Sequence, residues 1–327
     1  MKVLQITTNY PTISNPIFGI FMKEQVESLE KFNVENTIFF SNGSERKVGK
    51  KGAGAIIHFK SIFKLMWHLL TNRYDIIHCH SSLSGMILFL SGGAFFNKTV
   101  ISFQNDPEQE GDKSFFKILY PFYDVVIVKK HTKYDSWKKT VYLPNGCNMN
   151  FFHPMDTEYC KKQIGLDLNK RYVLFVDSNT SRKRTQKRKD RFDKVLELLK
   201  NQYAHNDIEE LVMIGVPRSA VPIWMNACEL HLLSSDQEGS PNSVKECLCC
   251  NVPVVSTNVG NVHDLLDDTE NCFVDDSFSA ENLAYLCDKV LRSPKSSSLN
   301  QSIIKKKLDI ESVADTLYRL YDDCVNG

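Results

Sequence analysis

The hydrophobic positions of this 327-residue chain form short runs that alternate with amphipathic stretches. In the first half, apolar runs rich in β-branched residues predict strands at 2–7, 35–40, 74–79, 99–103 and 125–128. Between them, helical periodicity predicts helices at 20–31, 62–70, 83–95 and 113–120. Near-continuous apolar strands that alternate with helices are typical of a parallel sheet covered on both faces.

The second half repeats this alternation. Strands are predicted at 172–176, 210–214, 230–233, 252–256 and 272–274, and helices at 190–201, 219–227, 243–250 and 280–292. A turn of Pro144, Asn145 and Gly146 separates the halves, and the length suits two domains. We therefore predict an α/β protein with a domain at 1–146, a second at 147–309 and a final helix within 310–327.

Composition limits the kinds of partner and compartment. The formal net charge is only +1, so no overall field favours nucleic acid. No apolar run is long enough for a signal peptide or a membrane span, and ten cysteines without a secretion signal are typical of reduced thiols. The C-x-x-C spacing at 247–250 has no second pair, which favours buried thiols over a metal site. We expect a cytoplasmic protein.

Two glutamates, Glu238 and Glu246, are separated by seven residues in the order strand, small-residue loop, helix, strand. A Gly-Ser-Pro-Asn loop at a helix start leaves backbone N–H groups without intrahelical partners. These groups and the positive end of the helix dipole suit a phosphate or a sugar hydroxyl. Pro241 fits the first helical turn. Each carboxylate can accept hydrogen bonds from a diol such as a sugar or a ribose.

Three segments together resemble the retaining nucleotide-sugar glycosyltransferases of the GT-B fold, of the family 4 kind. The first, at 238–264, is the Glu-x7-Glu segment with the Pro-Val-Val strand and the Gly-containing turn that follow it. The second is the Tyr-Leu-Pro-Asn-Gly linker at 142–154, and the third is the strand Asp-Ile-Ile-His-Cys-His at 75–80. The resemblance covers nearly the whole chain. It implies two Rossmann-like domains that face a central cleft, an acceptor-side N-terminal domain, a nucleotide-sugar-binding second domain, and a last helix that packs back on the first domain.

The resemblance also implies roles for the Glu-x7-Glu segment. Glu246 should grip the ribose of the nucleotide, and the alternative is an exposed helix glutamate paired with a lysine. Glu238 should act as a catalytic residue that contacts the donor sugar hydroxyls, and the alternative is an ordinary acidic loop residue. The residues that should surround the donor sugar and phosphates with their backbone are Gly239, Ser240, Pro241, Asn242 and Ser243.

A basic run at 179–191 follows the first strand of the second domain. Relatives carry an arginine and a lysine at this turn, where they bind the diphosphate, and Arg184 and Lys187 are the candidates here. The usual glycine neighbours are missing, so Arg182, Arg188 and Lys189 remain open as alternatives. The other interpretation of the run is a patch for nucleic acid or an anionic membrane.

Two residues of the first domain are donor-side or catalytic candidates. Gly19 follows the first strand, where a glycine permits close approach of the backbone to the leaving diphosphate, or is simply a turn glycine. His80 ends a strand, and in relatives a histidine there lies near the acceptor or the donor sugar. His78 points to the same side of that strand, so a buried structural pair is the alternative.

The acceptor side departs from the family pattern. Many relatives have His-Gly-x-Asp at the place where this chain has Gln104, Asn105 and Asp106 within 102–106. Only the aspartate of that motif survives, so Asp106 is the acceptor-side candidate.

The resemblance implies an enzyme that moves a hexosyl or N-acetylhexosaminyl group from a nucleotide-diphosphate sugar to a saccharide or lipid-linked acceptor, with retention of configuration. The leaving phosphate would take the acceptor proton, and no metal or other cofactor is expected. Surface polysaccharide synthesis, with peripheral association at the inner membrane face, is the expected setting. The alternatives are a GT-B-fold sugar-nucleotide epimerase and a non-catalytic nucleotide-binding subunit.

Overall fold

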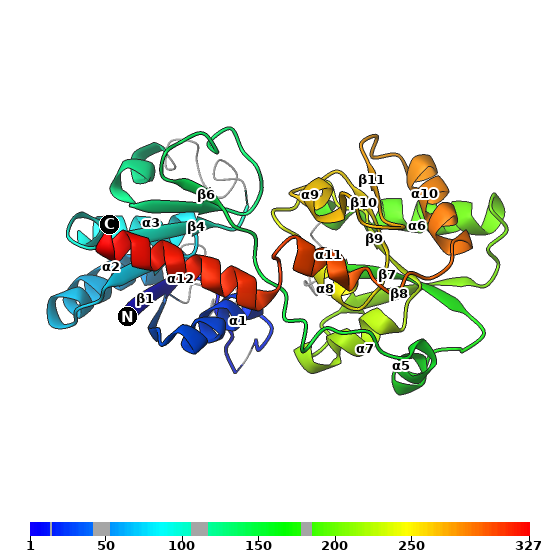
Figure 1. The fold of residues 1–327 in the computed structure, drawn as a ribbon, viewed down its shortest axis with the longest axis horizontal. Helices are drawn as coiled ribbons and strands as arrows, with labels where there is room; N and C mark the ends of the chain where they lie inside the picture. The colour runs from blue at the N-terminus through cyan, green and yellow to red at the C-terminus, as the bar shows by residue number, and fades with distance from the viewer. Residues whose placement is uncertain (14, 42–52, 106–116, 178–184) are drawn as a thin grey trace. The chain divides into compact units, whose positions relative to one another are not determined.

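The computed structural model describes residues 1–13, 15–41, 53–105, 117–177 and 185–327 (Figure 1). The chain forms two compact units. Unit 1 comprises Met1–Asn145 with Glu311–Gly327, and unit 2 comprises Gly146–Ile310. The junctions predicted from the sequence follow residues 146 and 309.

Unit 1 contains one sheet of six parallel strands in the order β2-β1-β3-β4-β5-β6. The strands are β1 (Lys2–Thr7), β2 (Glu35–Phe40), β3 (Ile76–Cys79), β4 (Thr99–Phe103), β5 (Val125–Val128) and β6 (Thr140–Tyr142). All five strands predicted for the first half are present, four of them with the predicted bounds. The sixth, β6, was not predicted, because its three residues are only partly buried and carry no apolar run.

The helices of unit 1 are α1 (Ile20–Ser28), α2 (Ala53–Thr71), α3 (Ser82–Leu90), the single turns η1 (Leu29–Phe32), η2 (Gly93–Phe95) and η3 (Tyr120–Phe122), and α12 (Ile310–Asn326). The helix predicted at 83–95 is divided, because Gly92 adopts φ 79°. The helix predicted at 62–70 is longer, since α2 carries apolar residues on more than one face and its period is hard to recognise. Of the helix predicted at 113–120, residues 113–116 lie outside the described residues, and residues 117–119 are helical.

The C-terminal helix α12 packs on unit 1. Its residues Val313, Leu317 and Tyr321 belong to one apolar cluster with Val3 and Ile76 of the sheet. The Tyr321 hydroxyl lies 2.5 Å from His78 Nδ1, in the middle of the unit. The end of the chain therefore completes the fold of unit 1.

Unit 2 contains five parallel strands in the order β11-β10-β9-β7-β8. They are β7 (Arg171–Asp177), β8 (Ile208–Ile214), β9 (Leu230–Leu233), β10 (Val254–Thr257) and β11 (Phe273–Asp275). All five predicted strands are present, β9 with the predicted bounds and the other four with ends shifted by one or two residues. The α/β class is confirmed.

Helices and single turns connect these strands. They are α5 (Thr157–Gln163), η4 (Thr185–Lys187), α6 (Lys189–Asn201), η5 (Arg218–Ala220), α7 (Val221–Asn226), α8 (Asn242–Cys249), α9 (Val262–Leu266), α10 (Ala280–Arg292) and α11 (Asn300–Lys305). The short helices α5, α9 and α11 were not predicted, because five to seven residues show too little periodicity. The ten cysteines are buried and unbridged. Within the described residues, no helix is long and apolar enough to cross a membrane.

The strand order reverses direction once in each sheet. In unit 1 the reversal lies between β1 and β3, and in unit 2 between β7 and β9. Ligands of open parallel sheets bind beyond the carboxyl ends of the strands at such a switch point. The loops that follow β1, β3, β7 and β9 are therefore the places to look for a site.

Candidate functional site

The switch point of unit 2 is occupied by an ion pair. Lys187 comes from the connection after β7, and Glu238 from the loop after β9. Lys187 Nζ lies 2.6 Å from Glu238 Oε1. Nearby, Gln186 Nε2 donates to the backbone oxygen of Gln237 at 3.0 Å. The fold thus brings together a basic and an acidic residue that are 51 positions apart in the sequence, both of which were predicted as site residues.

The pair between Lys187 and Glu238 is only partly shielded from water. Their side chains are 21% and 17% exposed. Glu238 Oε1 also accepts a hydrogen bond from the Ser235 hydroxyl at 2.8 Å, which fixes the carboxylate's orientation. An ammonium group in this position can exchange a carboxylate for a phosphate, which is also a strong acceptor of charged hydrogen bonds.

The other described members of the basic run have different carboxylate partners. Arg188 donates to Asp190 at 2.8 Å and to Asp236 at 3.1 Å. Lys189 pairs with Glu210 at 2.7 Å. Of Lys187, Arg188 and Lys189, only Lys187 is paired with the first glutamate of the motif. Arg182 and Arg184 lie outside the described residues.

Glu246, the second glutamate, lies on α8 and is paired with an arginine. Arg218 Nη1 donates to Glu246 Oε1 at 2.6 Å. Arg218 follows β8, and its guanidinium lies 4.6 Å from the ring centroid of Phe152. Both side chains remain partly exposed, Arg218 at 20% and Glu246 at 11%. Arg218 was not predicted as a site residue, and its position shortly after a strand is the only signal for it in the sequence.

Two buried basic groups hold the loop that starts α8. Lys245 Nζ donates to the Ser240 hydroxyl at 3.1 Å, and burial lowers the pKa of this fully buried lysine to about 8. His231 lies 3.0 Å through Nδ1 from the Leu174 carbonyl and 3.1 Å through Nε2 from the Ser243 hydroxyl. Burial lowers the pKa of His231 to about 4, so the neutral ring donates through Nδ1 and accepts from Ser243.

The backbone of the same loop is fixed by the turn after β10. Asn261 N donates to the carbonyl of Gly239 at 3.0 Å. Gly260 has φ +61°, and a Cβ there would lie 2.1 Å from that same carbonyl oxygen. Pro241 is the N-cap of α8, one position before the first helical turn where it was expected, so α8 begins at Asn242.

In unit 1, Gly19 lies in the connection after β1. It has φ +69° and is the N-cap of α1. A Cβ at this position would lie 2.5 Å from the backbone oxygen of Asn9. The glycine is therefore required by a close crossing of the chain with itself, and its contact with a diphosphate stays a prediction.

His80 directly follows β3 and is buried. Its Nε2 lies 2.6 Å from Gln5 Oε1, and its ring centroid is 3.9 Å from that of His78. Gln5 Nε2 donates to Asn36, which leaves its Oε1 to accept from His80. Burial lowers the pKa of His80 to about 3, with a further contribution from Lys129. The buried histidine pair considered as the alternative is therefore present.

The neutral His80 ring has one unused nitrogen. Because Nε2 donates to Gln5, Nδ1 carries the lone pair, and within the described part of the chain it has no hydrogen-bond partner. The loops after β1 and β3 meet here, with the hydroxyls of Thr8 and Ser81 3.4 Å apart. His80 thus ends at the switch point of unit 1 with a buried acceptor nitrogen to which no described group donates.

The remaining acceptor-side motif is only partly described. Asn145 Nδ2 donates to Gln104 Oε1 at 3.3 Å, and Asp106 lies outside the described residues. No three histidine, cysteine or acidic residues gather into a metal site in the parts of the chain that the structure covers.

Comparison with known proteins points to one kind of enzyme. Residues 193–308, which include both glutamates, match the family model described as Glycosyl transferases group 1. Over 332 residues the chain is 24% identical to the putative teichuronic acid biosynthesis glycosyltransferase TuaC of Bacillus subtilis (strain 168), covering 81% of this chain and 83% of that protein.

Solved structures share the fold over almost the whole chain. Sucrose-phosphate synthase from Thermosynechococcus elongatus has a TM-score of 0.71 at 14% identity, covering 99% of this chain and 98% of that one. Anabaena HepE in complex with UDP and glucose has a TM-score of 0.69 at 14% identity, with 98% and 99% covered. A glycosyltransferase from Rickettsia africae ESF-5 has a TM-score of 0.72 at 14% identity, with 100% and 99% covered. At these identities the likeness establishes the fold, two Rossmann-like domains of the GT-B type.

Proposed function

Because this chain is a GT-B protein that carries a glycosyl transferases group 1 domain, we propose that it transfers a sugar from a nucleoside diphosphate sugar to an acceptor hydroxyl, with retention of configuration. The donor class is supported by Anabaena HepE, which shares the fold and was solved with UDP-glucose. A hexosyl or N-acetylhexosaminyl group and a saccharide or lipid-linked acceptor fit the relationship to a teichuronic acid enzyme. We place the reaction in surface polysaccharide synthesis in the cytoplasm, without nucleic acid.

The observation that carries this proposal is the pair of Lys187 and Glu238 at the switch point of unit 2. A diphosphate that binds there would take the place of the carboxylate as the partner of Lys187. Glu238 would then be available to accept hydrogen bonds from the donor sugar hydroxyls. The start of α8, where the first backbone N–H groups have no intrahelical partner and the N-cap Pro241 makes no side-chain cap, would add positive potential close to the same phosphates.

Glu246 is proposed to bind the ribose diol. Arg218 already holds one of its carboxylate oxygens at 2.6 Å, which orients the group at little cost when the nucleotide arrives. Lys245 and His231 orient the loop in the same way, since they hold Ser240 and Ser243 in place before the nucleotide binds. The loop residues Gly239 to Ser243 thus form a prearranged cradle.

The proposed reaction needs little proton chemistry from the protein. The bond between the anomeric carbon and the leaving phosphate oxygen breaks while the acceptor oxygen attacks from the same face, and the leaving phosphate takes the acceptor proton. Glu238 is proposed to lie beside the positive charge that develops on the sugar, and Lys187 beside the negative charge that develops on the phosphate. On unit 1, Gly19 is proposed to face the diphosphate and His80 the acceptor. We propose that no metal cofactor takes part.

The test is an assay that follows donor and product together. A thermal-shift screen of UDP, GDP, ADP and CMP first identifies the base. The matching nucleotide sugars are then incubated with saccharide and lipid-linked acceptors, while free nucleotide and the anomeric configuration of the product are recorded. Transfer with retention supports the proposal. Conversion of the donor without an acceptor product indicates an epimerase, and nucleotide binding without turnover indicates a binding subunit.

A further inference from the structure

Lys245 of helix α8 carries a buried charge that the proposed reaction does not use. Its side chain is fully shielded from water, and its helix neighbours Val244, Cys247 and Leu248 belong to an apolar cluster of unit 2. Burying an ammonium group costs free energy, and a methionine of similar volume would fill the same space without that cost. What the lysine alone supplies is a charged hydrogen-bond donor, which Nζ directs at the Ser240 hydroxyl at 3.1 Å.

The hydroxyl of Ser243, at the start of the same helix, can only accept further hydrogen bonds. Nδ1 of the neutral His231 ring donates to the Leu174 carbonyl at 3.0 Å, so Nε2 carries the lone pair. Ser243 therefore donates its proton to Nε2 at 3.1 Å. The oxygen of Ser243 keeps its lone pairs for a group that brings a proton of its own.

The hydroxyl of Ser240 is in the opposite state. An ammonium group has three protons and no lone pair, so Lys245 donates and the Ser240 oxygen accepts. Among the described residues this is the one hydrogen bond of that hydroxyl. Ser240 is also partly exposed. Its proton is therefore available to a bound ligand.

The two serines lie between Glu238 and Glu246 in the sequence. Under the proposed function Glu238 contacts the donor sugar and Glu246 the ribose, so the diphosphate that joins sugar and ribose lies between them. Ionised phosphate oxygens accept hydrogen bonds and have no proton to donate, so they suit Ser240, whereas the lone pairs of Ser243 would repel them. Ser243 lies three positions before Glu246 on one side of α8, where it suits a ribose hydroxyl.

We propose that Lys245 is a positioning residue for the donor: its hydrogen bond to Ser240 leaves the proton of that hydroxyl for a phosphate oxygen of the nucleoside diphosphate. His231 has the complementary effect on Ser243, whose oxygen then accepts a hydrogen bond from a ribose hydroxyl. These roles rest on the function proposed above, and they assign one class of ligand atom to each serine.

The experiment is calorimetric titration of the full chain with two ligands, the nucleoside diphosphate that the thermal-shift screen selects (UDP, GDP or ADP) and the matching nucleoside. Ser240→Ala should weaken diphosphate binding by about tenfold, because a hydrogen bond to a charged group is lost, and leave nucleoside binding unchanged. Ser243→Ala should change both affinities by the same factor, because both ligands contain the ribose. No loss for Ser240→Ala, or a loss for Ser243→Ala that is confined to the diphosphate, would overturn the assignment.

A double-mutant cycle separates positioning from packing. Lys245→Met should weaken diphosphate binding by about tenfold, and the double variant with Ser240→Ala should bind about as weakly as either single variant, because both changes remove the same hydrogen bond. Independent losses would multiply to about a hundredfold. That result, or unchanged affinity in Lys245→Met, would overturn the role of Lys245.

Lys161→Met is the matched control, since Lys161 is also a buried lysine of unit 2. Its Nζ donates to the Lys170 carbonyl, just before β7, at 2.8 Å and lies 3.7 Å from Glu229, just before β9. Lys161 therefore lies at the amino ends of these strands, whereas the donor loop follows the carboxyl end of β9. Lys161→Met should bind the diphosphate as the unchanged chain does. A loss equal to that of Lys245→Met would show that both lysines act through the fold, and would contradict the proposal.

The pH dependence of binding tests the charge of Lys245 without changing it. Burial lowers the pKa of Lys245 to about 8, and the other titratable groups that act on it are Cys147, Glu246 and Cys249. The pKa of Cys147 is raised well above its ordinary value by the hydrogen bond from Cys249 and by burial, so this thiol keeps its proton up to pH 9. Glu246 is paired with Arg218.

A neutral amine accepts the Ser240 proton instead of donating to the oxygen. The ratio of diphosphate affinities between the unchanged chain and Ser240→Ala should therefore fall from about tenfold at pH 7 to about threefold or less at pH 9. Ionisation of the ligand and of other groups affects both proteins alike and cancels in this ratio. A constant ratio from pH 7 to pH 9 would overturn the role of Lys245.

Failure of this role differs from failure of the proposed function. If the unchanged chain binds none of the nucleotides, the function proposed above is wrong, and the roles of Lys245 and Ser240 are wrong with it. If the unchanged chain binds a diphosphate and Lys245→Met and Ser240→Ala bind it equally well, the nucleotide site remains and only the positioning role is wrong.

Discussion

The polar groups at the switch points of the two units differ in charge, since those of unit 2 are charged and those of unit 1 are neutral. In unit 2 the groups are charged pairs, Lys187 with Glu238 and Arg218 with Glu246, and all four side chains keep some exposure. In unit 1 they are the neutral histidines His78 and His80, buried and bonded to other side chains. The same topology therefore supports an electrostatic site in one unit and a rigid polar core in the other.

The difference arises from the charge of the groups that pair with these side chains. Each cation at the unit 2 site meets a carboxylate, and a partly exposed ion pair can exchange its partner for a ligand with modest loss. His78 and His80 have neutral partners, and burial lowers the pKa of each, so the rings stay uncharged. We infer that unit 2 carries the donor chemistry and that unit 1 supplies shape and neutral hydrogen bonds.

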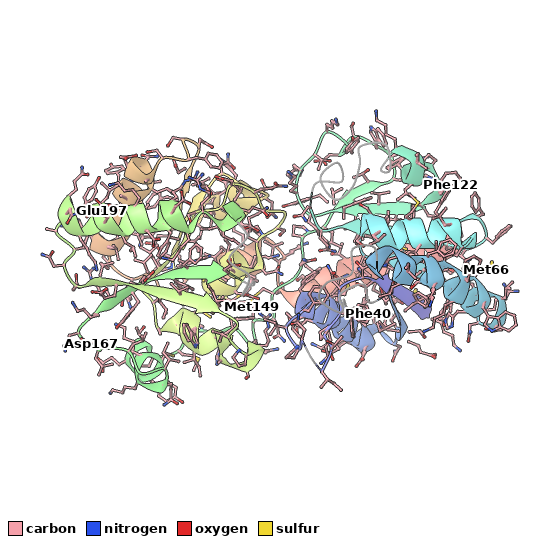
Figure 2. All side chains as sticks on the ribbon, turned by 180° about the vertical axis from the view of Figure 1, so that it is seen from behind. Phe40, Met66, Phe122, Met149, Asp167 and Glu197 are labelled. Carbon is pink, nitrogen blue, oxygen red and sulfur yellow. The ribbon has the colours of Figure 1, made fainter. Side chains whose placement is uncertain are left out.

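The largest effect should come from Glu238. Glu238→Gln keeps the size of the side chain but removes the charge that we place beside the developing sugar cation, so turnover should fall by about 10²-fold. Nucleotide affinity should change little. Glu197→Gln, on the exposed side of α6 (Figure 2), is the control. Turnover within twofold of the unchanged chain would remove Glu238 from catalysis.

Substitution of His80 tests whether unit 1 takes a direct part in the transfer reaction. His80→Ala removes the buried Nδ1 acceptor that we propose meets the sugar acceptor, and should lower the transfer rate by about tenfold, the value of one good hydrogen bond, while nucleotide affinity stays the same. The thermal midpoint is measured in parallel, because a buried ring is lost. A lower midpoint with full turnover would make His80 a purely structural residue.

Substitution of Lys187 tests the proposed contact between its ammonium group and the diphosphate. Lys187→Ala should weaken nucleoside diphosphate binding by roughly tenfold and leave binding of the free nucleoside unchanged, because only the diphosphate gains a charged hydrogen bond. Combining it with Arg184→Ala should widen the gap. Lys194→Ala, an exposed lysine on α6, is the control. Equal losses for nucleoside and diphosphate, or tight salt-sensitive binding to random DNA, would argue for a different role of the basic run.

The sequence predicted unit 2 in more functional detail than unit 1. The order of strand, loop and helix around Glu238 and Glu246 could be recognised, because a local motif contains both glutamates. Arg218 and Lys245 could not, since their partners, Glu246 and Ser240, are chosen by the packing of η5 and α8. Sequence alone marked Lys187 among several equal cations, and the fold pairs it with Glu238.

In unit 1 five of the six strands were predictable, but the environment of His80 was not. A histidine at the end of an apolar strand can be exposed or buried, and the choice here depends on Gln5 from β1. The length of α2 was underestimated for a related reason. Exposed apolar side chains on α2, such as Phe63 and Trp67, hide the amphipathic pattern by which a surface helix is usually recognised.

The smallest expected effect is the pH dependence of the free energy of unfolding that the buried His80 of unit 1 introduces. The folded pKa of His80 is about 3, below its usual 6.5, so the stability from the neutral ring is fully present above pH 6.5 and is lost as the pH falls toward 3. From pH 7 to pH 6 the free energy of unfolding should fall by about 1 kcal/mol or less for this histidine. His80→Gln should reduce that slope, and the exposed His263→Gln should not. Equal slopes in all three proteins would show that His80 is not held neutral.

The central claim is that unit 2 binds a nucleoside diphosphate, with its ribose held by Glu246, and calorimetric titration of the diphosphate chosen by the thermal-shift screen tests it directly. We predict that Glu246→Ala binds roughly tenfold or more weakly, a loss of about 1.5–3 kcal/mol, because one charged hydrogen bond to the ribose is removed. Glu238→Gln and the control Glu197→Gln should bind as the unchanged chain does. If Glu246→Ala binds with unchanged affinity, the nucleotide does not occupy this site and the account is wrong.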